Sequence, residues 1–180
     1  MAIKRYLANK DNTIVNTYQS NLQTRGTGSN TGYADVMEVY SIYGRESSGS
    51  QELSRILVEF PVNDISTDRT AGVIPASGSV SYYLRLFNAQ HSKTVPEDYT
   101  ITVNPLSQSW QEGTGLDLET YKDVTRGNIG SNWMSASNTA AWTNVGGTII
   151  TSSSDYLYEQ TFENGLEDLE VNITPLVESL

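Results

Sequence analysis

The side chains that could carry acid–base or metal chemistry are few and stand far apart along the chain. His91 is the only histidine, and it lies in the polar stretch AQHSKTVPED with no nucleophile motif around it. A serine hydrolase needs a histidine beside its serine, so a catalytic triad in this chain would have to use His91. One histidine and no cysteine also exclude the familiar ligand sets of zinc. We interpret His91 as a solvated loop residue.

Carboxylates are abundant enough to suggest a calcium site, because calcium takes oxygen ligands. Two groups of them stand close together in the sequence: Asp117, Glu119 and Asp123, and further on Glu163, Glu167, Asp168 and Glu170. Neither group has the spacing of a calcium-binding loop, in which acidic residues alternate ahead of a glycine. The pattern favours a solvated acidic surface in both places, so we predict no metal and no cofactor.

Three tryptophans, Trp110, Trp133 and Trp142, punctuate the irregular region around residues 111–147. Glu112 lies close to Trp110, and a glycosidase combines an aromatic platform with two carboxylates that flank the sugar. No second carboxylate can be paired with Glu112 from the sequence. Exposed indole rings would stack on sugars, which makes the three tryptophans the candidate glycan-stacking residues. The favoured interpretation is that they fill the open end of a core, where large rings close irregular gaps.

Composition and charge limit the class of protein. The 180 residues suffice for one domain with a sizeable core, and no apolar run approaches the ~20 residues of a membrane-spanning helix. The net charge of −10 repels nucleic-acid phosphates and would suit a basic patch on a protein partner. The opening residues MAIKRY lack the apolar core of an export signal. We therefore expect synthesis in a cytoplasm and neither a nucleic-acid nor a membrane partner.

Alternating apolar residues predict the strands that would position these groups. In SVSYYLRLF every second residue from Val80 to Leu86 is apolar, and the alternation restarts at residues 99–103 after a polar loop. Two such runs predict an antiparallel pair. Residues 53–60, LSRILVEF, predict another strand, which Pro61 ends because proline cannot donate to a ladder. The predicted core residues on these strands are Ile56, Val58, Leu84, Leu86 and Val103.

The remaining pieces predict six to eight short strands and almost no helix. Residues 170–177 are predicted as the last strand, and short helices are expected at residues 64–67 and 116–122. The pattern predicts an all-β fold, a β-sandwich of jelly-roll type with long polar loops and little helix. A closed barrel fits the unequal loops less well. We predict a single domain over residues 1–180.

Seven pieces follow one another along the chain: DNTIVN, SRILVEFPVNDIS, SVSYYLRLFNA, VNPLSQSWQEG, SNW, AWTNVGG and LEVNITPLV. In this order they resemble the DNRLRE-type β-sandwich family. Each piece is unspecific alone, but the ordered set covers nearly the whole chain. Some members of that family look like carbohydrate-binding modules of secreted polysaccharide enzymes.

Four longer stretches, MAIKRY, QELSRILVEFPVNDISTDRT, QSWQEGTGLDLE and GSNWMSASNTAAWT, are similar to virion structural proteins of tailed phages that infect marine bacteria. This resemblance implies a non-enzymatic head-decoration, neck or tail component that is assembled in the host cytoplasm. Its expected partners are other virion proteins, including further copies of itself. The alternative is a carbohydrate-binding module for host-surface polysaccharide. The two predictions differ in whether the tryptophans are buried or line an exposed groove.

One departure from the family concerns the C-terminal strand. Members continue past the T-x-L-V strand with a Trp-x-x-Gly turn and another strand pair, whereas this sequence ends at Leu180. The resemblance therefore implies an incomplete edge, which later residues or a neighbouring chain would cover. For the isolated chain it predicts rapid exchange of the amides of residues 170–173.

Overall fold

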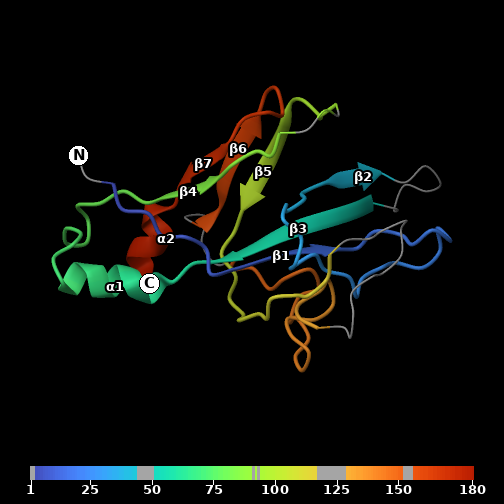
Figure 1. Cartoon of the computed structure of the whole chain (residues 1–180), viewed down its shortest axis with the longest axis horizontal. Helices are drawn as coiled ribbons and strands as arrows, with labels where there is room; N and C mark the ends of the chain where they lie inside the picture. Colours follow the sequence, from blue (N-terminus) through green and yellow to red (C-terminus); the bar gives the residue numbers. More distant parts are fainter. Residues whose placement is uncertain (1–2, 44–50, 91, 93, 117–128, 152–155) are drawn as a thin grey trace. The chain divides into compact units, whose positions relative to one another are not determined.

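The computed structural model in Figure 1 describes residues 3–43, 51–90, 92, 94–116, 129–151 and 156–180. The chain divides into two compact units. Unit 1 comprises Met1–Arg5, Pro61–Pro105 and Ile149–Leu180, and unit 2 comprises Tyr6–Phe60 and Leu106–Thr148. The described part of the chain contains seven short strands and two short helices, which confirms the all-β prediction in its coarse form. The prediction of one sandwich domain stays a prediction.

Unit 2 is built on a three-stranded antiparallel sheet in the order β1–β3–β2 (Figure 1). Its strands are β1 (Lys10–Val15), β2 (Ser41–Tyr43) and β3 (Gln51–Glu59). The run Thr13–Val15 is β-branched throughout, which favours extended backbone. The register pairs Ile14 with Arg55 and Asn12 with Leu57, so these four side chains share one face.

That shared face is the core side of β3, and it is the opposite of the predicted one. Leu57 is only 4% exposed and packs with Ile14, whereas Ile56 and Val58 are half-buried. Successive side chains of a strand alternate between faces, so the core side carries Leu53 and Leu57. Both parities of LSRILVEF are apolar enough to face a core. The tryptophan rings of a distant segment decide between them by covering the Leu57 side.

Unit 1 contains two two-stranded antiparallel sheets. In one, β4 (Tyr83–Leu86) pairs with β7 (Leu169–Asn172); in the other, β5 (Tyr99–Val103) pairs with β6 (Tyr158–Phe162). The predicted pairing of β4 with β5 is therefore wrong. A short turn through Gly165, whose φ is +70°, joins β6 to β7, and each of the two earlier strands takes one of these as its partner.

The two sheets of unit 1 share one apolar cluster. Its buried members are Phe162, Leu169 and Val171, and Leu84, Leu86 and Val103 pack against them. The predicted inner parity of these last three is confirmed, but they are half-buried rather than fully buried. Two-stranded sheets are too narrow to cover both flanks of a core, which explains the remaining exposure.

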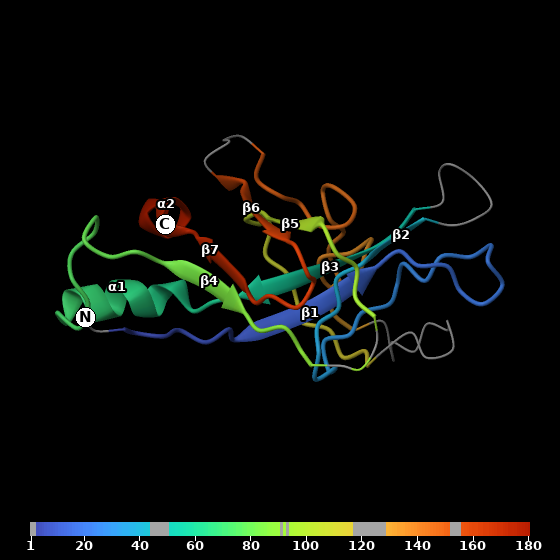
Figure 2. The ribbon, with the colours of Figure 1, turned by 90° about the horizontal axis from the view of Figure 1, so that it is seen from above.

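The two helices both belong to unit 1. Helix α1 (Val62–Thr70) extends the predicted turn at residues 64–67, and α2 (Thr174–Ser179) replaces the second half of the predicted last strand. Pro175 lies in the first turn of α2, where the missing N–H costs no hydrogen bond. The helix expected at residues 116–122 falls almost wholly outside the described residues. Figure 2 shows α1 and α2 beside the β4–β7 pair.

The edge of β7 that faces away from β4 is hydrogen-bonded by a side chain of β6. Gln160 of β6 donates from Nε2 to the carbonyl oxygen of Asp168 at 2.8 Å and accepts at Oε1 from the N–H of Glu170 at 2.7 Å. The carboxamide thus bonds the O and N–H that flank Leu169, as a residue of a parallel strand would. The N–H of Ile173 is also bonded, to the carbonyl oxygen of Tyr82 at 2.9 Å. Rapid exchange of the Glu170 and Ile173 amides is therefore no longer expected.

Candidate functional site

The three tryptophans lie in the core of unit 2. Trp110, Trp133 and Trp142 are 8%, 7% and 5% exposed and pack with Ile14 and Leu57. The indole N–H of Trp142 donates to the carbonyl oxygen of Asn132 at 2.7 Å. Since their rings are covered by protein atoms, they form no open platform on which a sugar could stack. This arrangement corresponds to the interpretation that they fill a core.

Buried polar side chains hold the loops that carry these tryptophans. Asn132 accepts at Oδ1 from the N–H groups of Met134 and Ser135, which closes a tight turn beside Trp133. Asn12 of β1 donates from Nδ2 to the carbonyl oxygen and the hydroxyl of Ser131, at 3.0 and 2.8 Å. An irregular segment can be buried only when its backbone groups find such partners.

Asn30 ties three segments of unit 2 together. It accepts at Oδ1 from the N–H of Gly115 at 2.8 Å and donates from Nδ2 to the carbonyl oxygen of Ile129 at 3.0 Å. A Cβ atom on Gly113 would lie 2.0 Å from Asn30 Oδ1, so only glycine fits there. Asn30 is 1% exposed, and its role is to position the chain on either side of residues 117–128.

Glu112 has an acidic neighbour that the sequence did not indicate. The N–H of Asp11 donates to Glu112 Oε1 at 3.0 Å, although the two residues are 101 positions apart. Burial, and then the charge of Glu112, raise the pKa of the Asp11 carboxyl. Glu112 therefore caps the backbone of β1. A contact between residues so distant in sequence leaves no local signal.

The acidic group near the C-terminal strand is also engaged in structural bonds. Glu167 accepts from the backbone N–H groups of Glu163, Asn164 and Leu166 at 2.9–3.0 Å. These backbone bonds, first that of Asn164, lower the pKa of Glu167. Asp168 accepts from the N–H of Asn88 at 3.0 Å. In the described part of the chain, no three histidine, cysteine or carboxylate side chains are placed to share a metal ion.

The other predicted candidates fall outside the description. His91 and the carboxylates Asp117, Glu119 and Asp123 are not among the described residues.

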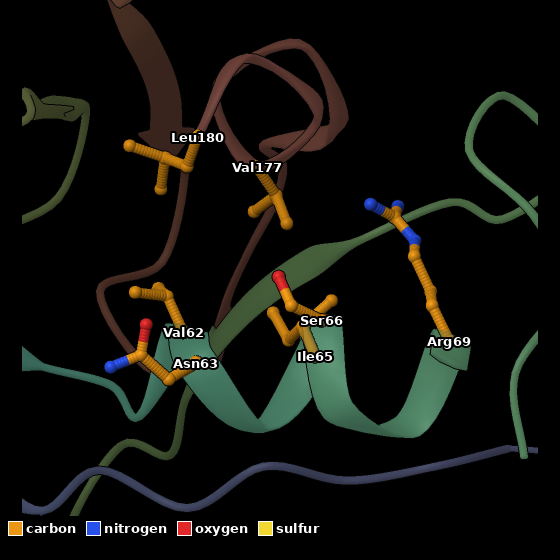
Figure 3. Close-up of a pocket in the computed structure, with 7 residues that line it drawn as sticks. All are labelled: Val62, Asn63, Ile65, Ser66, Arg69, Val177 and Leu180. Atoms are coloured by element: carbon orange, nitrogen blue, oxygen red, sulfur yellow. The ribbon is translucent and has the colours of Figure 1, made fainter. Parts of the chain in front are cut away.

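A shallow hollow lies between the two helices of unit 1. Figure 3 shows Val177 of α2 facing Ile65 and Ser66 of α1 across it. Its volume is about 60 Å³. Small-molecule sites usually measure several hundred Å³, so this hollow is large enough for water but not for a sugar ring.

Exposed apolar side chains form the most distinctive surface features. On the outer face of β4, Tyr83 is 57% exposed and Phe87, just beyond its end, is 72% exposed. Arg85 lies between them, with its guanidinium 4.9 Å from the Phe87 ring. In unit 2, β2 and the segment that leads into it expose four more large apolar side chains: Tyr33, Val36, Val39 and Ile42. Groups of exposed apolar side chains are typical of surfaces that contact other proteins.

Comparison with protein-family models, with curated proteins and with solved structures found no match to this chain. Among the described residues, neither helix has the length and apolar character needed to cross a bilayer.

Proposed function

We propose that this chain is a non-enzymatic structural protein of a phage virion, a head-decoration, neck or tail component that acts through contacts with other virion proteins. The proposal combines the ordered sequence pieces with the character of the surface. The chain would act within the particle after assembly in the host cytoplasm.

The exposure of apolar side chains carries the proposal. Among the described residues, eighteen large apolar side chains are more than a third exposed, whereas twelve apolar residues are buried. Single exposed apolar residues are normal on any protein. Here several are grouped, at Tyr83 and Phe87 and along residues 33–42. An interaction protein needs such surfaces, because its partners bury them.

The polar groups support the same proposal. Glu112 and Glu167, which the sequence offered for acid–base or metal chemistry, accept hydrogen bonds from backbone N–H groups. The tryptophans, which the carbohydrate alternative required at a surface, pack in a core. We therefore keep polysaccharide binding as an outcome of the test rather than as a second proposal. We also infer that the small sheets belong to a β-sandwich of jelly-roll type that neighbouring chains complete.

The test is to look for the chain in purified particles of the phage that encodes it. Mass spectrometry of washed particles should find it in many copies, and gold-labelled antibody should mark one fixed region of the particle. A phage enzyme made in the same infection is the control and should be absent. Absence of the chain from washed particles would contradict the proposal. So would tight binding of host polysaccharide by the purified protein.

A further inference from the structure

Residues 3–8, which we call the donor segment, belong to no strand, and all of them except the half-buried Tyr6 are exposed. Ile3 and Leu7 are each 80% exposed, the highest values among the large apolar side chains described. The charged residues of the segment are Lys4 and Arg5, and both are basic. Lys4 pairs with Asp68 at 3.0 Å, a partly exposed ion pair of the kind that holds a segment only weakly.

Strand β2 has an open edge, and the charge around this edge is opposite in sign to that of the donor segment. The N–H of Ser54 in β3 donates to the carbonyl oxygen of Tyr40 at 3.1 Å, so the backbone of Tyr40 faces β3. Backbone groups alternate in an antiparallel ladder, so the N–H and C=O of Ser41 point to the other side. On that side no strand among the described residues pairs with β2. An unpaired edge beside exposed apolar side chains is a template for another strand.

The charges of the two elements are complementary. Residues 33–43, which we call the acceptor edge, contain Asp35 and Glu38 and no basic residue. They also carry Val36, Val39 and Ile42, each about half exposed. The donor segment brings basic and apolar side chains, which match an acidic and apolar edge. This local match opposes the repulsion expected between two chains of net charge −10.

The register of unit 2 places the start of β1, which the donor segment precedes, and strand β2 of the acceptor edge at opposite ends of β3. The N–H of Asn9 donates to the carbonyl oxygen of Glu59 at 2.9 Å, at the last residue of β3. Strand β2 pairs with the other end of β3, at Gln51–Leu53. Glu59 lies six positions along the strand from Leu53, roughly 20 Å at ~3.3 Å per residue. The chain therefore enters β1 at the end of the sheet opposite to its own acceptor edge.

We propose that the donor segment of one copy adds as a strand to the acceptor edge of a second copy. This inference rests on the proposed function, because it names one contact that a multi-copy virion protein would make. Main-chain hydrogen bonds supply the affinity in strand addition, and side chains supply the specificity. The contact joins different surfaces on the two copies, so it is head-to-tail and repeats to form a ring or a filament.

Sedimentation velocity of the full chain tests this contact. The wild-type weight-average sedimentation coefficient should rise with concentration through dimers and larger species. Ser41→Pro removes the outward N–H of the acceptor edge, and the double change Ile3→Asp with Leu7→Asp disables the donor segment. Each variant should associate at least tenfold more weakly. Val73→Asp with Leu157→Asp adds the same charge at other exposed apolar positions and should associate like the wild type.

Mixing the two disabled variants is the decisive step. The Ser41→Pro chain keeps a working donor, and the Ile3→Asp, Leu7→Asp chain keeps a working acceptor, so together they should form a 1:1 dimer and nothing larger. If Ser41→Pro does not fold, as circular dichroism would reveal, Asp35→Lys with Glu38→Lys replaces it as the acceptor-disabled variant.

Three outcomes would overturn the inference: a wild-type chain that stays monomeric at several hundred micromolar, a donor variant that associates like the wild type, or a mixture that stays monomeric. None of these outcomes removes the chain from purified particles, so this inference can fail while the proposed function stands.

Discussion

Replacement of Gln160 by methionine should weaken the β7 side of unit 1, because it removes the carboxamide that bonds this strand edge. Two hydrogen bonds disappear, to Asp168 O at 2.8 Å and from Glu170 N at 2.7 Å, while the side chain keeps nearly the same volume. Each such bond contributes about 0.5–1.5 kcal/mol. Glu170 is exposed and water can replace part of the loss, so we expect a destabilisation of about 1–2 kcal/mol.

Hydrogen exchange read residue by residue, together with urea denaturation, measures this effect. The Glu170 amide should exchange roughly ten times faster in Gln160→Met, since ~1.4 kcal/mol corresponds to a factor of ten. Glu159→Met is the matched control, because residue 159 is the exposed neighbour on the other face of β6. The control should leave the Glu170 amide unchanged. A change below about 0.5 kcal/mol with unaltered exchange at Glu170 would refute the role given to this side chain.

Three further predictions concern stability. Leu169→Ala should cost about 2–5 kcal/mol in urea denaturation because Leu169 is 5% exposed, whereas Leu166→Ala, at a position 66% exposed, should change little. Asn30→Ala should lower the free energy of unfolding by about 2–4 kcal/mol in the same assay, because it leaves the buried N–H of Gly115 and the carbonyl of Ile129 without their partner. An Asn30→Ala variant as stable as the wild type would contradict this role of Asn30. Because folding raises the pKa of Asp11 above 3.8, the contribution of Asp11 to wild-type stability should fall as pH rises from 3.8 through the raised pKa. Thermal unfolding at pH 3–7 should show Asp11→Asn without this fall and more stable than the wild type at pH 7, and parallel profiles would refute the assignment.

The strands and their inner parities could be predicted where apolar and polar residues alternate strictly. Leu84 and Leu86 point to the cluster of unit 1 as the alternation of SVSYYLRLF predicts. The partner of a strand is a different matter, since β4 pairs with a strand more than 80 residues away. Alternation of apolar and polar residues predicts a strand and its faces, but it does not predict which other strand pairs with it. The predicted pairing of β4 with β5 was therefore wrong.

The C-terminal helix shows a competing local signal. Leu169 and Val171 alternate as a strand should, but Pro175 fits the first turn of a helix, and the chain changes structure at Thr174.

The features of the site were predictable to different degrees. Tryptophans in a core follow from their size, whereas the contact between Asp11 and Glu112 depends on strand β1 meeting a distant loop in space.

Hydrogen exchange on the isolated chain and on the chain within purified particles tests most directly whether it works through protein contacts. The outward amide of Ser41, at the open edge of β2, should exchange rapidly in the isolated chain and slowly in the particle. Buried amides of β1 should be protected in both states and serve as the internal control. Equal exchange along the whole chain in the two states would contradict the account, because a protein that acts through its exposed apolar surfaces must cover them on assembly.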